Sequence, residues 1–415
     1  MSISDWRKVK LGDVIEINKN SYSAHDNWDY INYLDTGNIT ENRIDSIQYL
    51  DTKSDKIPSR AKRKVNANEI IYSTVRPNQK HYGIIKKPFD NMLVSTGFAV
   101  INGKDELADN GFLYWYLTQE HIVELLHTIG ENSTSAYPSI KPSDIEGLDI
   151  SLPSLPEQKA IAATLSALDD MIELNNKVNK TLEEMAQAIF KSWFVDFEPF
   201  RDGEFEESEL GLIPKGWRVG KLSDVGEIIG GGTPSKSKPE YYSEIGIPWI
   251  TPKDLSINKN KYISRGEIDI SELGLRESNA RLMPKGTVLF SSRAPIGYIA
   301  IAKNAVTTNQ GFKSVVPFEN ISSEYIYLLL KNSINEIESR ATGSTFKEIS
   351  GGEMKKVPII LPPKEIIRKF NEIATTLGKT QASLEDENSI LMSIRDTLLP
   401  KLMTGEIRVP VEEVV

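Results

Sequence analysis

The sequence predicts an α+β protein: a tandem-duplicated chain whose two globular mixed α/β domains are joined by two long antiparallel coiled-coil helices with pseudo-two-fold symmetry. Three observations lead to this fold class. The chain repeats itself with a period of about 210 residues. The first part of each repeat consists of short apolar runs separated by turn residues, and the second part carries apolar residues at the spacing of a long helix.

The duplication is visible in segments that match in the same order. Residues 6–17 (WRKVKLGDVIEI) match residues 217–228 (WRVGKLSDVGEI) without a gap, and residues 68–77 (NEIIYSTVRP) resemble residues 286–295 (GTVLFSSRAP). Further pairs of matching segments are STGF and NQGF, YWYL and YIYL, and SDIEGLDISLP and GEMKKVPIILP. Colinear matches at a nearly constant offset indicate an internal duplication.

The globular part of each repeat is predicted to be rich in strands. Glycine, proline and asparagine turn signals bound the apolar runs at residues 69–73, 93–101, 286–290 and 313–316. One helix is predicted near the end of each globular part, over residues 112–126 and 323–337. We expect globular domains at residues 1–153 and 205–362, and helical regions at 154–204 and 363–415.

Each helical region is predicted to form one long helix. Pro156 and Glu157 suit a helix start, and the second helix begins near residue 364. A helix of about 36 residues is roughly 55 Å long and needs a partner, for which its own twin is the nearest candidate. The residues expected at the helix pair, and in docking partner proteins, are Ile161, Leu165, Leu168, Asn179, Leu182, Ile189, Trp193, Leu377, Leu384, Asn388, Leu391 and Leu398.

Asn179 and its repeat equivalent Asn388 fall on this apolar seam. A buried seam asparagine can fix the register of two helices. A solvated break in the coiled coil is the other interpretation.

Composition excludes several classes of protein. The chain has no cysteine, so it has neither disulfides nor thiolate chemistry, and its four histidines have no metal-binding spacing. The N-terminus has no apolar signal segment and no apolar run is long enough to span a membrane, so we expect a cytoplasmic protein. The net charge is −9, and residues 151–204 hold ten acidic but five basic side chains.

Motifs for catalysis are incomplete. The run GGGTPSKS at residues 230–237 resembles a phosphate-binding loop, but Ser235 stands where that loop has glycine, and Pro239 disfavours a following helix. Asp144, Glu157 and Lys159 spell a nuclease pattern, yet Glu157 is placed at a helix start. We therefore expect no catalytic site and no metal site.

Basic and polar loops recur in both repeats. Residues 59–64 (SRAKRK) carry four positive charges, and residues 76–83 and 291–298 are equivalent turns that each place an arginine just after a strand. Such side chains hold phosphates or read base edges. A solvated surface is the alternative for any one loop, but the recurrence favours function.

The second repeat carries motifs that resemble the specificity subunit of type I restriction–modification systems. They are residues 230–255 (GGGTPSKSKPEYYSEIGIPWITPKDL), 291–301 (SSRAPIGYIAI), 307–312 (TTNQGF) and 341–349 (ATGSTFKEI), with LPP before the second long helix. The first repeat departs from this pattern because it lacks the GGTP run. Its LPEQKAI segment at residues 155–161 fits well.

This resemblance implies two target recognition domains, each reading one half of a bipartite, asymmetric site on double-stranded DNA. It implies that the helices set the unread spacer and dock two modification subunits, with restriction subunits in the complete enzyme. It also implies that S-adenosylmethionine, ATP and Mg belong to those partners, and that this chain has no cofactor. The residues expected to contact DNA are Arg60, Lys62, Arg63, Lys64, Arg76, Lys80, Tyr82, Thr233, Ser235, Lys236, Lys253, Arg293, Gln310, Ser344 and Thr345.

Two other functions remain open from the residues alone. One is a scaffold whose globular domains bind proteins. The other is an enzyme that binds a nucleotide at the glycine run, in which Lys236 would be essential.

Overall fold

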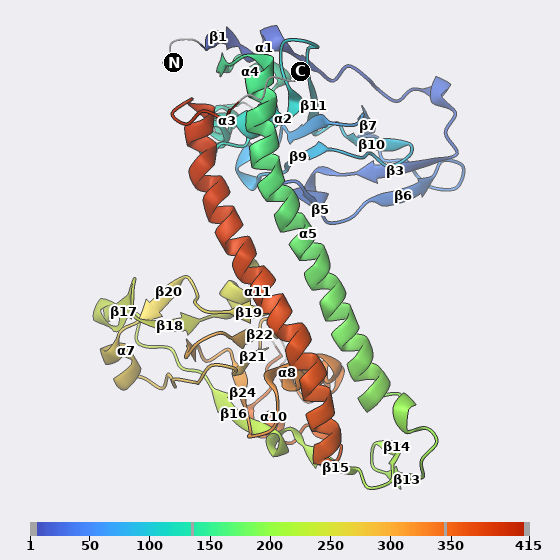
Figure 1. The fold of residues 1–415 in the computed structure, drawn as a ribbon, viewed down its shortest axis with the longest axis vertical. Helices are drawn as coiled ribbons and strands as arrows, with labels where there is room; N and C mark the ends of the chain where they lie inside the picture. The colour runs from blue at the N-terminus through green and yellow to red at the C-terminus, as the bar shows by residue number, and fades with distance from the viewer. Residues whose placement is uncertain (1–5, 134–136, 344–346, 411–415) are drawn as a thin grey trace. The chain divides into compact units, whose positions relative to one another are not determined.

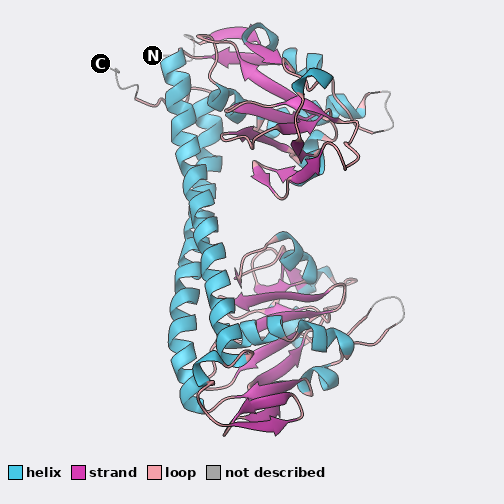
Figure 2. Ribbon diagram, turned by 90° about the vertical axis from the view of Figure 1, so that its right-hand side faces the viewer, coloured by secondary structure: helices cyan, strands magenta, loops and turns pink. Residues whose placement is uncertain are grey.

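The computed structural model describes residues 6–133, 137–343 and 347–410. The chain separates into two compact units, Met1–Ile172 with Ile390–Val415, and Glu173–Ser389. Figure 1 colours the ribbon along the chain, and Figure 2 colours it by secondary structure. Each unit combines the globular part of one repeat with a segment of each long helix.

Among the described residues, the globular part of the first unit contains twelve strands and four short α-helices. The strands are β1 (Arg7–Lys10), β2 (Ile15–Ile17), β3 (Tyr30–Leu34), β4 (Ile39–Thr40), β5 (Arg43–Ile44), β6 (Gln48–Asp51), β7 (Ala61–Lys64), β8 (Glu69–Ser73), β9 (Tyr82–Ile85), β10 (Met92–Ser95), β11 (Phe98–Gly103) and β12 (Asp149–Leu152). The helices are α1 (Leu11–Val14), α2 (Asn110–Leu117), α3 (Glu120–Glu131) and α4 (Pro142–Glu146).

The second unit has a similar set, preceded by a hairpin. Its strands are β13 (Phe205–Ser208), β14 (Gly211–Pro214), β15 (Arg218–Lys221), β16 (Gly226–Gly230), β17 (Tyr242–Ser243), β18 (Ile247–Ile250), β19 (Tyr262–Ile263), β20 (Ile268–Ile270), β21 (Val288–Ser292), β22 (Ile296–Ala302), β23 (Thr307–Thr308), β24 (Lys313–Pro317) and β25 (Pro358–Leu361). Its short helices are α6 (Pro252–Ile257), α7 (Glu272–Arg276), α8 (Ser323–Asn332), α9 (Ile334–Ser339) and α10 (Gly351–Lys355).

The two units share one sheet topology. The order β2-β11-β8-β9 in the first unit corresponds to β16-β24-β21-β22 in the second. The order β6-β3-β10 corresponds to β20-β18-β23, and in both cases the last two strands run parallel while the first two run antiparallel. The structure thus confirms the predicted duplication and the mixed α/β character of each globular part.

Two predicted elements are each divided in the structure. The run over residues 93–101 forms β10 and β11, which belong to different sheets and are separated by a turn at Thr96 and Gly97. The helical run over 112–126 forms α2 and α3, because Gln119 adopts an extended backbone. The corresponding run in the second repeat divides at Ser333 into α8 and α9. Since α2 is buried almost all round, its apolar pattern gave no sign of the break.

Each long helix has forty residues: α5 is Leu155–Phe194 and α11 is Lys364–Met403. Both views show them side by side. In the first unit Arg395 of α11 donates to Asp169 of α5 at 2.7 Å. In the second unit Phe194 packs edge-on against Phe370, with ring centroids 4.9 Å apart. Because the partner number falls as the α5 number rises, the helices are antiparallel, as predicted.

The residues expected at the helix pair are all buried or half-buried. Ile161, Leu165, Asn388 and Leu391 are buried, and the others are half-buried: Leu168, Asn179, Leu182, Ile189, Trp193, Leu377, Leu384 and Leu398. The residues chosen from the helical spacing thus lie on the sides of the two helices that are shielded from solvent.

Asn179 and Asn388, the two asparagines that the sequence places on the seam, have different partners in the structure. Asn388 pairs with Asn175, whose side-chain amide donates to the Asn388 oxygen at 3.0 Å, and both residues are buried. Asn179 is half-buried, and its backbone carbonyl accepts from Gln381 at 3.2 Å. The buried partner of Asn388 is thus one helical turn before Asn179.

Replacing Asn388 alone by leucine should lower the free energy of unfolding by about 1–3 kcal/mol, because the buried Asn175 amide loses the Asn388 oxygen and is left with the Glu387 carboxylate at 3.2 Å. The double variant N175L/N388L should recover most of this loss, since two leucines suit a coiled-coil seam. Urea unfolding followed by tryptophan fluorescence measures both. Equal losses in the single and double variants would contradict the proposed pairing.

Candidate nucleic-acid interface

At the glycine run that ends β16, the backbone passes very close to other segments of the chain. A Cβ atom on Gly231 would lie 1.9 Å from the Asn309 carbonyl oxygen, and one on Gly232 would lie 2.3 Å from the Asn279 carbonyl carbon. The Gly232 amide donates to the Thr308 carbonyl at 2.9 Å. Gly231 therefore lets the chain pass against the segment around Asn309, and Gly232 lets it pass against Asn279, which any side chain would prevent.

This crossing brings together segments that are far apart in the sequence. The Thr233 hydroxyl donates to the side-chain oxygen of Gln310. The backbone amide of Ser292 donates to the Gly311 carbonyl at 2.7 Å, which joins the turn after β21 to the same segment. Arg293 forms a β-bridge with Glu348 and also an ion pair at 3.3 Å. Four motifs of the second repeat thus converge on one place.

The exposed side chains of this place are polar or basic. Ser235, Lys236 and Gln310 are exposed, Thr233 and Arg293 are half-buried, and the Ser235 hydroxyl lies 2.9 Å from that of Ser237. Hydroxyls, amides and cationic groups are the donors and acceptors that contact phosphates and base edges. We name this group the second-unit cluster: Thr233, Ser235, Lys236, Arg293, Gln310, Lys313 and Glu348.

Lys313 and Glu348 were not predicted from the sequence. The Lys313 amine lies 3.5 Å from the Glu348 carboxylate and 3.4 Å from the Ser292 hydroxyl, and only 15% of its side chain is exposed. Lys313 follows the NQGF motif directly, so its position beside that motif was an available signal. Ser344 and Thr345 lie outside the residues that the structure describes.

The first unit builds a corresponding place from different side chains. Both the amide and the hydroxyl of Thr74 donate to the Gly97 carbonyl, at 2.8 and 2.9 Å. The Arg76 amide donates to the Pro138 carbonyl at 2.9 Å, and its guanidinium lies over the Tyr137 ring, 5.2 Å from the centroid. An arginine of the first unit thus lies beside the segment around residue 138. In the second unit, Arg293 of the equivalent turn lies beside Glu348.

In both units the residue before the turn proline adopts a left-handed backbone. The φ angle is 48° at Arg76 and 53° at Ala294, which precede Pro77 and Pro295. A non-glycine residue in this region is unfavourable by roughly 1 kcal/mol and persists only where its surroundings hold it. In the second unit, the Ser291 hydroxyl donates to the Pro295 carbonyl at 2.8 Å and accepts from the Tyr298 amide at 2.7 Å. These two hydrogen bonds stabilise the turn of the second unit.

Arg60, which directly precedes β7, lies close to the turn that contains Arg76 in the first unit. A Cβ atom on Gly97 would lie 2.7 Å from an Arg60 guanidinium nitrogen, so Arg60 adjoins the Thr74–Gly97 contact. Arg60 and Lys62 are exposed, while Arg63 and Lys64 are half-buried. Lys64 is ion-paired with Asp26, and the hydrogen bond from Lys64 lowers the pKa of that carboxyl.

Three further predicted contact residues are also held by other groups. Tyr82 is buried in β9, where its ring stacks on Tyr72 with centroids 5.5 Å apart, so we remove it from the candidate interface. Lys80 donates to Glu120 at 2.8 Å, and this hydrogen bond raises the pKa of Lys80. Lys253 is likewise paired with Glu267 at 2.6 Å, and the hydrogen bond raises its pKa.

The glycine run lacks the geometry of a phosphate-binding loop. The element after Ser237 is a three-residue 3-10 helix, Pro239–Tyr241, and Gly231 and Gly232 are covered by backbone. Within residues 6–133, 137–343 and 347–410, no group of three or more His, Asp or Glu side chains could hold a metal ion. In the same residues, no helix is both long and apolar enough to cross a membrane.

A duplicated fold with one polar loop cluster in each repeat defines a class of two-domain recognition proteins, and comparison identifies the family. A family model described as "Type I restriction modification DNA specificity domain" matches residues 3–184 and 214–392, so it covers both repeats. The chain therefore belongs to the specificity subunits of type I restriction–modification systems. It is the DNA specificity subunit, a non-catalytic component of such an enzyme.

Individual relatives agree with this assignment. The specificity subunit of the type I restriction enzyme HindI from Haemophilus influenzae is 29% identical over 98% of this chain and 100% of its own. The specificity subunit of MjaIX from Methanocaldococcus jannaschii is 45% identical over 46% of this chain and 44% of its own. The crystal structure of a type I restriction–modification S subunit from M. genitalium has the same fold, with a TM-score of 0.58, 18% identity and 96% of each chain covered.

Proposed function

We propose that the globular parts of the two repeats are target recognition domains, and that each reads one half of a bipartite, asymmetric site on double-stranded DNA. The long helices set the length of the unread spacer and dock two modification subunits. Methyl transfer from S-adenosylmethionine and cleavage driven by ATP with Mg belong to the modification and restriction subunits of the complex.

The observation that carries this proposal is the convergence of loop motifs at one place in each unit. The second-unit cluster presents Thr233, Gln310 and Arg293, whereas the first unit presents Arg60 and Arg76 beside the Tyr137 ring. The same topology thus carries different donors and acceptors. Because base edges differ in their donor and acceptor patterns, two different loop sets favour two different half-sites.

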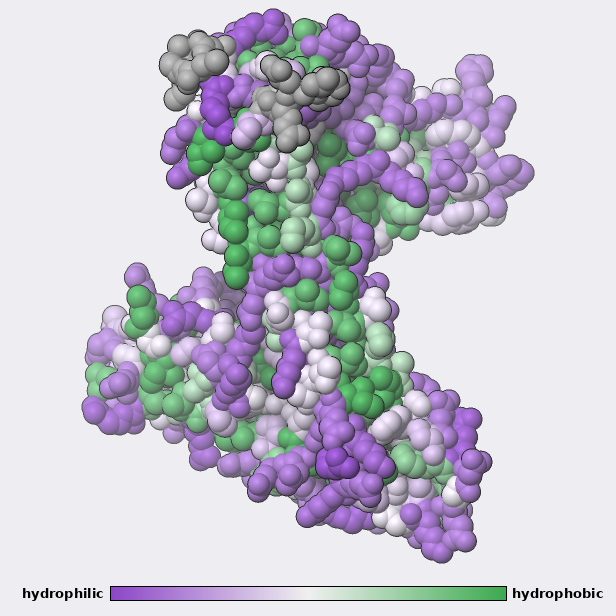
Figure 3. Space-filling model, in the orientation of Figure 1, coloured by the Kyte–Doolittle hydropathy of each residue, from purple (hydrophilic) through white to green (hydrophobic). Residues whose placement is uncertain are grey.

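The helix surface supports docking of protein partners. Leu174, Val178 and Met185 lie four and seven residues apart on α5 and are 60%, 37% and 46% exposed. On α11, Ile390 and Ile394 are also exposed, and Figure 3 shows apolar side chains on the surface of both helices. Exposed apolar side chains on one helix stripe favour packing against further helices of a partner. The acidic balance of residues 151–204 suits a protein partner better than DNA.

Exchange of one recognition domain tests the proposal. When residues 1–150 are replaced by the first domain of another specificity subunit, we expect one half-site to change while the other half and the spacer stay the same. The readout is methylome sequencing of a host that expresses the chimaera with its modification subunit. Alteration of both halves would contradict the assignment of one domain to each half. Normal assembly without affinity for any DNA duplex would instead favour a scaffold.

A further inference from the structure

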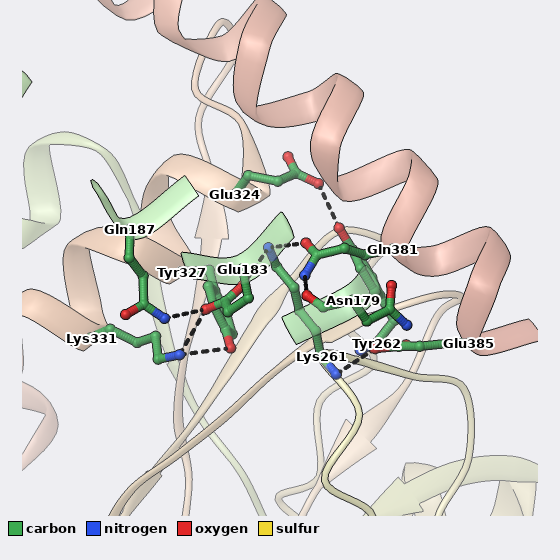
Figure 4. A network of polar contacts seen from close by, with 10 residues as sticks. All are labelled: Asn179, Glu183, Gln187, Lys261, Tyr262, Glu324, Tyr327, Lys331, Gln381 and Glu385. Carbon is green, nitrogen blue, oxygen red and sulfur yellow. Dashed lines mark hydrogen bonds and ion pairs between the residues drawn. The ribbon is translucent and has the colours of Figure 1, made fainter. Parts of the chain in front are cut away.

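One buried lysine joins the second globular part to both long helices. Lys261 precedes β19, and only 5% of its side chain is exposed. Its amine donates to Gln381 of α11 at 2.9 Å and pairs with Glu183 of α5 at 3.2 Å. Figure 4 shows the Lys261 amine between the Glu183 carboxylate of α5 and the Gln381 amide of α11. A single side chain thus contacts both helices at once.

The backbone of the same segment is fixed as well. The amides of Lys261 and Tyr262 donate to the two carboxylate oxygens of Glu385, at 2.8 and 3.1 Å. Burial raises the pKa of Glu385 to about 7, although these two amides act in the opposite direction. A carboxylate that accepts two adjacent backbone amides defines where along α11 the segment can lie.

A glycine inside α11 makes room for this contact. A Cβ atom on Gly378 would lie 2.4 Å from the Tyr262 hydroxyl oxygen and 2.8 Å from a Glu324 carboxylate oxygen. Glycine in a helix interior is less favourable than alanine, so its presence needs a reason such as this close approach. Gly378, Gln381 and Glu385 are spaced three and four residues apart, so they form one stripe that faces residues 261 and 262.

Further groups hold Glu183 in its charged form. Lys331 of α8 pairs with Glu183 at 2.7 Å, and the Gln187 amide donates to it at 2.8 Å. Although burial acts against ionisation, Lys261 and Lys331 lower the pKa of Glu183 to about 2. In the first unit, the globular part reaches α5 through different groups: the Asp109 amide donates to the buried Gln158 at 2.9 Å, Trp115 donates to Ser166, and Lys86 forms an exposed ion pair with Asp170.

We propose that Lys261 and Tyr262, seated on the Gly378–Gln381–Glu385 stripe, are positioning residues that set the spacer length recognised by the complex. This inference rests on the proposed function of the helices as a spacer. If the domain moved by one helical turn, about 5.4 Å, the Lys261 amine and both backbone amides would lose their partners together. The aromatic core that joins Tyr325 to Phe194 and Phe370 still holds the domain on the helices when this contact is lost. One base pair of DNA rises about 3.4 Å, so a domain whose contact with the stripe is loosened could accept spacers that differ by one base pair.

The test is methylation of DNA sites whose spacers are of native length, one base pair shorter and one base pair longer. The assembled complex of this chain with its modification subunits carries Lys261→Met. We expect the preference for the native spacer to fall by about tenfold, while the sequence preference within each half-site stays unchanged. Lys259→Met, an exposed lysine two residues away, is the matched control and should keep the wild-type ratio.

Gly378→Ala provides a second variant. Its methyl group occupies the space beside the Tyr262 hydroxyl, while alanine favours the helical conformation of α11 more than glycine does. In the Lys261→Met variant, Glu183 keeps its ion pair with Lys331, so the half-buried carboxylate is not left without a cation. A uniform loss of methylation at all three spacers in both variants, with unchanged ratios, would show a structural role only and overturn the proposal, as would unchanged ratios at full activity. If the wild-type complex showed no spacer preference, the proposed function itself would fail, whatever the variants did.

Discussion

Gly231→Ala is expected to abolish recognition by the second domain, whereas Gly230→Ala is expected to leave it intact. The alanine methyl on residue 231 would lie 1.9 Å from the Asn309 carbonyl oxygen and 2.4 Å from the Thr308 hydroxyl. On residue 230 the nearest neighbour is a side-chain carbon of Lys313 at 4.0 Å. Overpacking against fixed backbone lowers the free energy of unfolding by about 1–3 kcal/mol or more.

The expected loss of recognition in Gly231→Ala follows from a displaced backbone. Asn309 precedes Gln310, and a shift of this backbone would separate Gln310 from Thr233 and move the segment that contacts Ser292. The side chains that we place at the DNA would then no longer share one geometry. Both substitutions remove the same conformational freedom of glycine from the unfolded chain, so the comparison isolates the native-state clash.

Two measurements check this expectation. Urea unfolding should show a lower free energy for Gly231→Ala than for Gly230→Ala. Methylation by the assembled complex should be lost only in the former, with the complex still formed through the helices. Equal stability and equal methylation in the two variants would show that the close crossing of the glycine run does not exist in solution.

The overall plan of the fold could be predicted because the repeat and the helical spacing are both visible along the chain, without knowledge of contacts in space. The 4-3 spacing of Ile161 and Leu165 indicated residues that are buried in the structure, and the recurring turns indicated Arg76 and Arg293 as candidate DNA contacts. The pairing of Asn388 with Asn175 depends on the relative translation of two helices. No pattern within either helix determines that translation.

The residues that the sequence did not identify act through contacts between distant segments. Lys261 lies in an ordinary polar loop, and its role depends on Glu183, Gln381 and Glu385 from two helices that are remote in the chain. Tyr82 was named as a candidate DNA contact within the turn segment 76–83. Strand β9 instead places it beside Tyr72 in the core, since alternate residues of a strand face opposite sides.

Arg293→Ala is expected to weaken binding of the cognate duplex by roughly 10- to 100-fold, as loss of one good contact to DNA would. Arg218→Ala is the matched control. Arg218 pairs with Asp224 at 3.4 Å much as Arg293 pairs with Glu348 at 3.3 Å, but it lies on β15, outside the second-unit cluster. A general effect of removing one surface charge would therefore appear in both variants.

The salt dependence of binding distinguishes what Arg293 contacts. If it holds a phosphate, the slope of the logarithm of affinity against the logarithm of salt concentration should fall by about one, with sequence preference unchanged. If it reads a base edge, preference should relax at one position of the second half-site only. The equivalent substitution Arg76→Ala should then affect the first half-site alone, because the two arginines occupy corresponding turns of separate domains. Binding by Arg293→Ala that matches binding by Arg218→Ala would exclude the second-unit cluster from the DNA interface, and with it the link between the shared motifs and recognition.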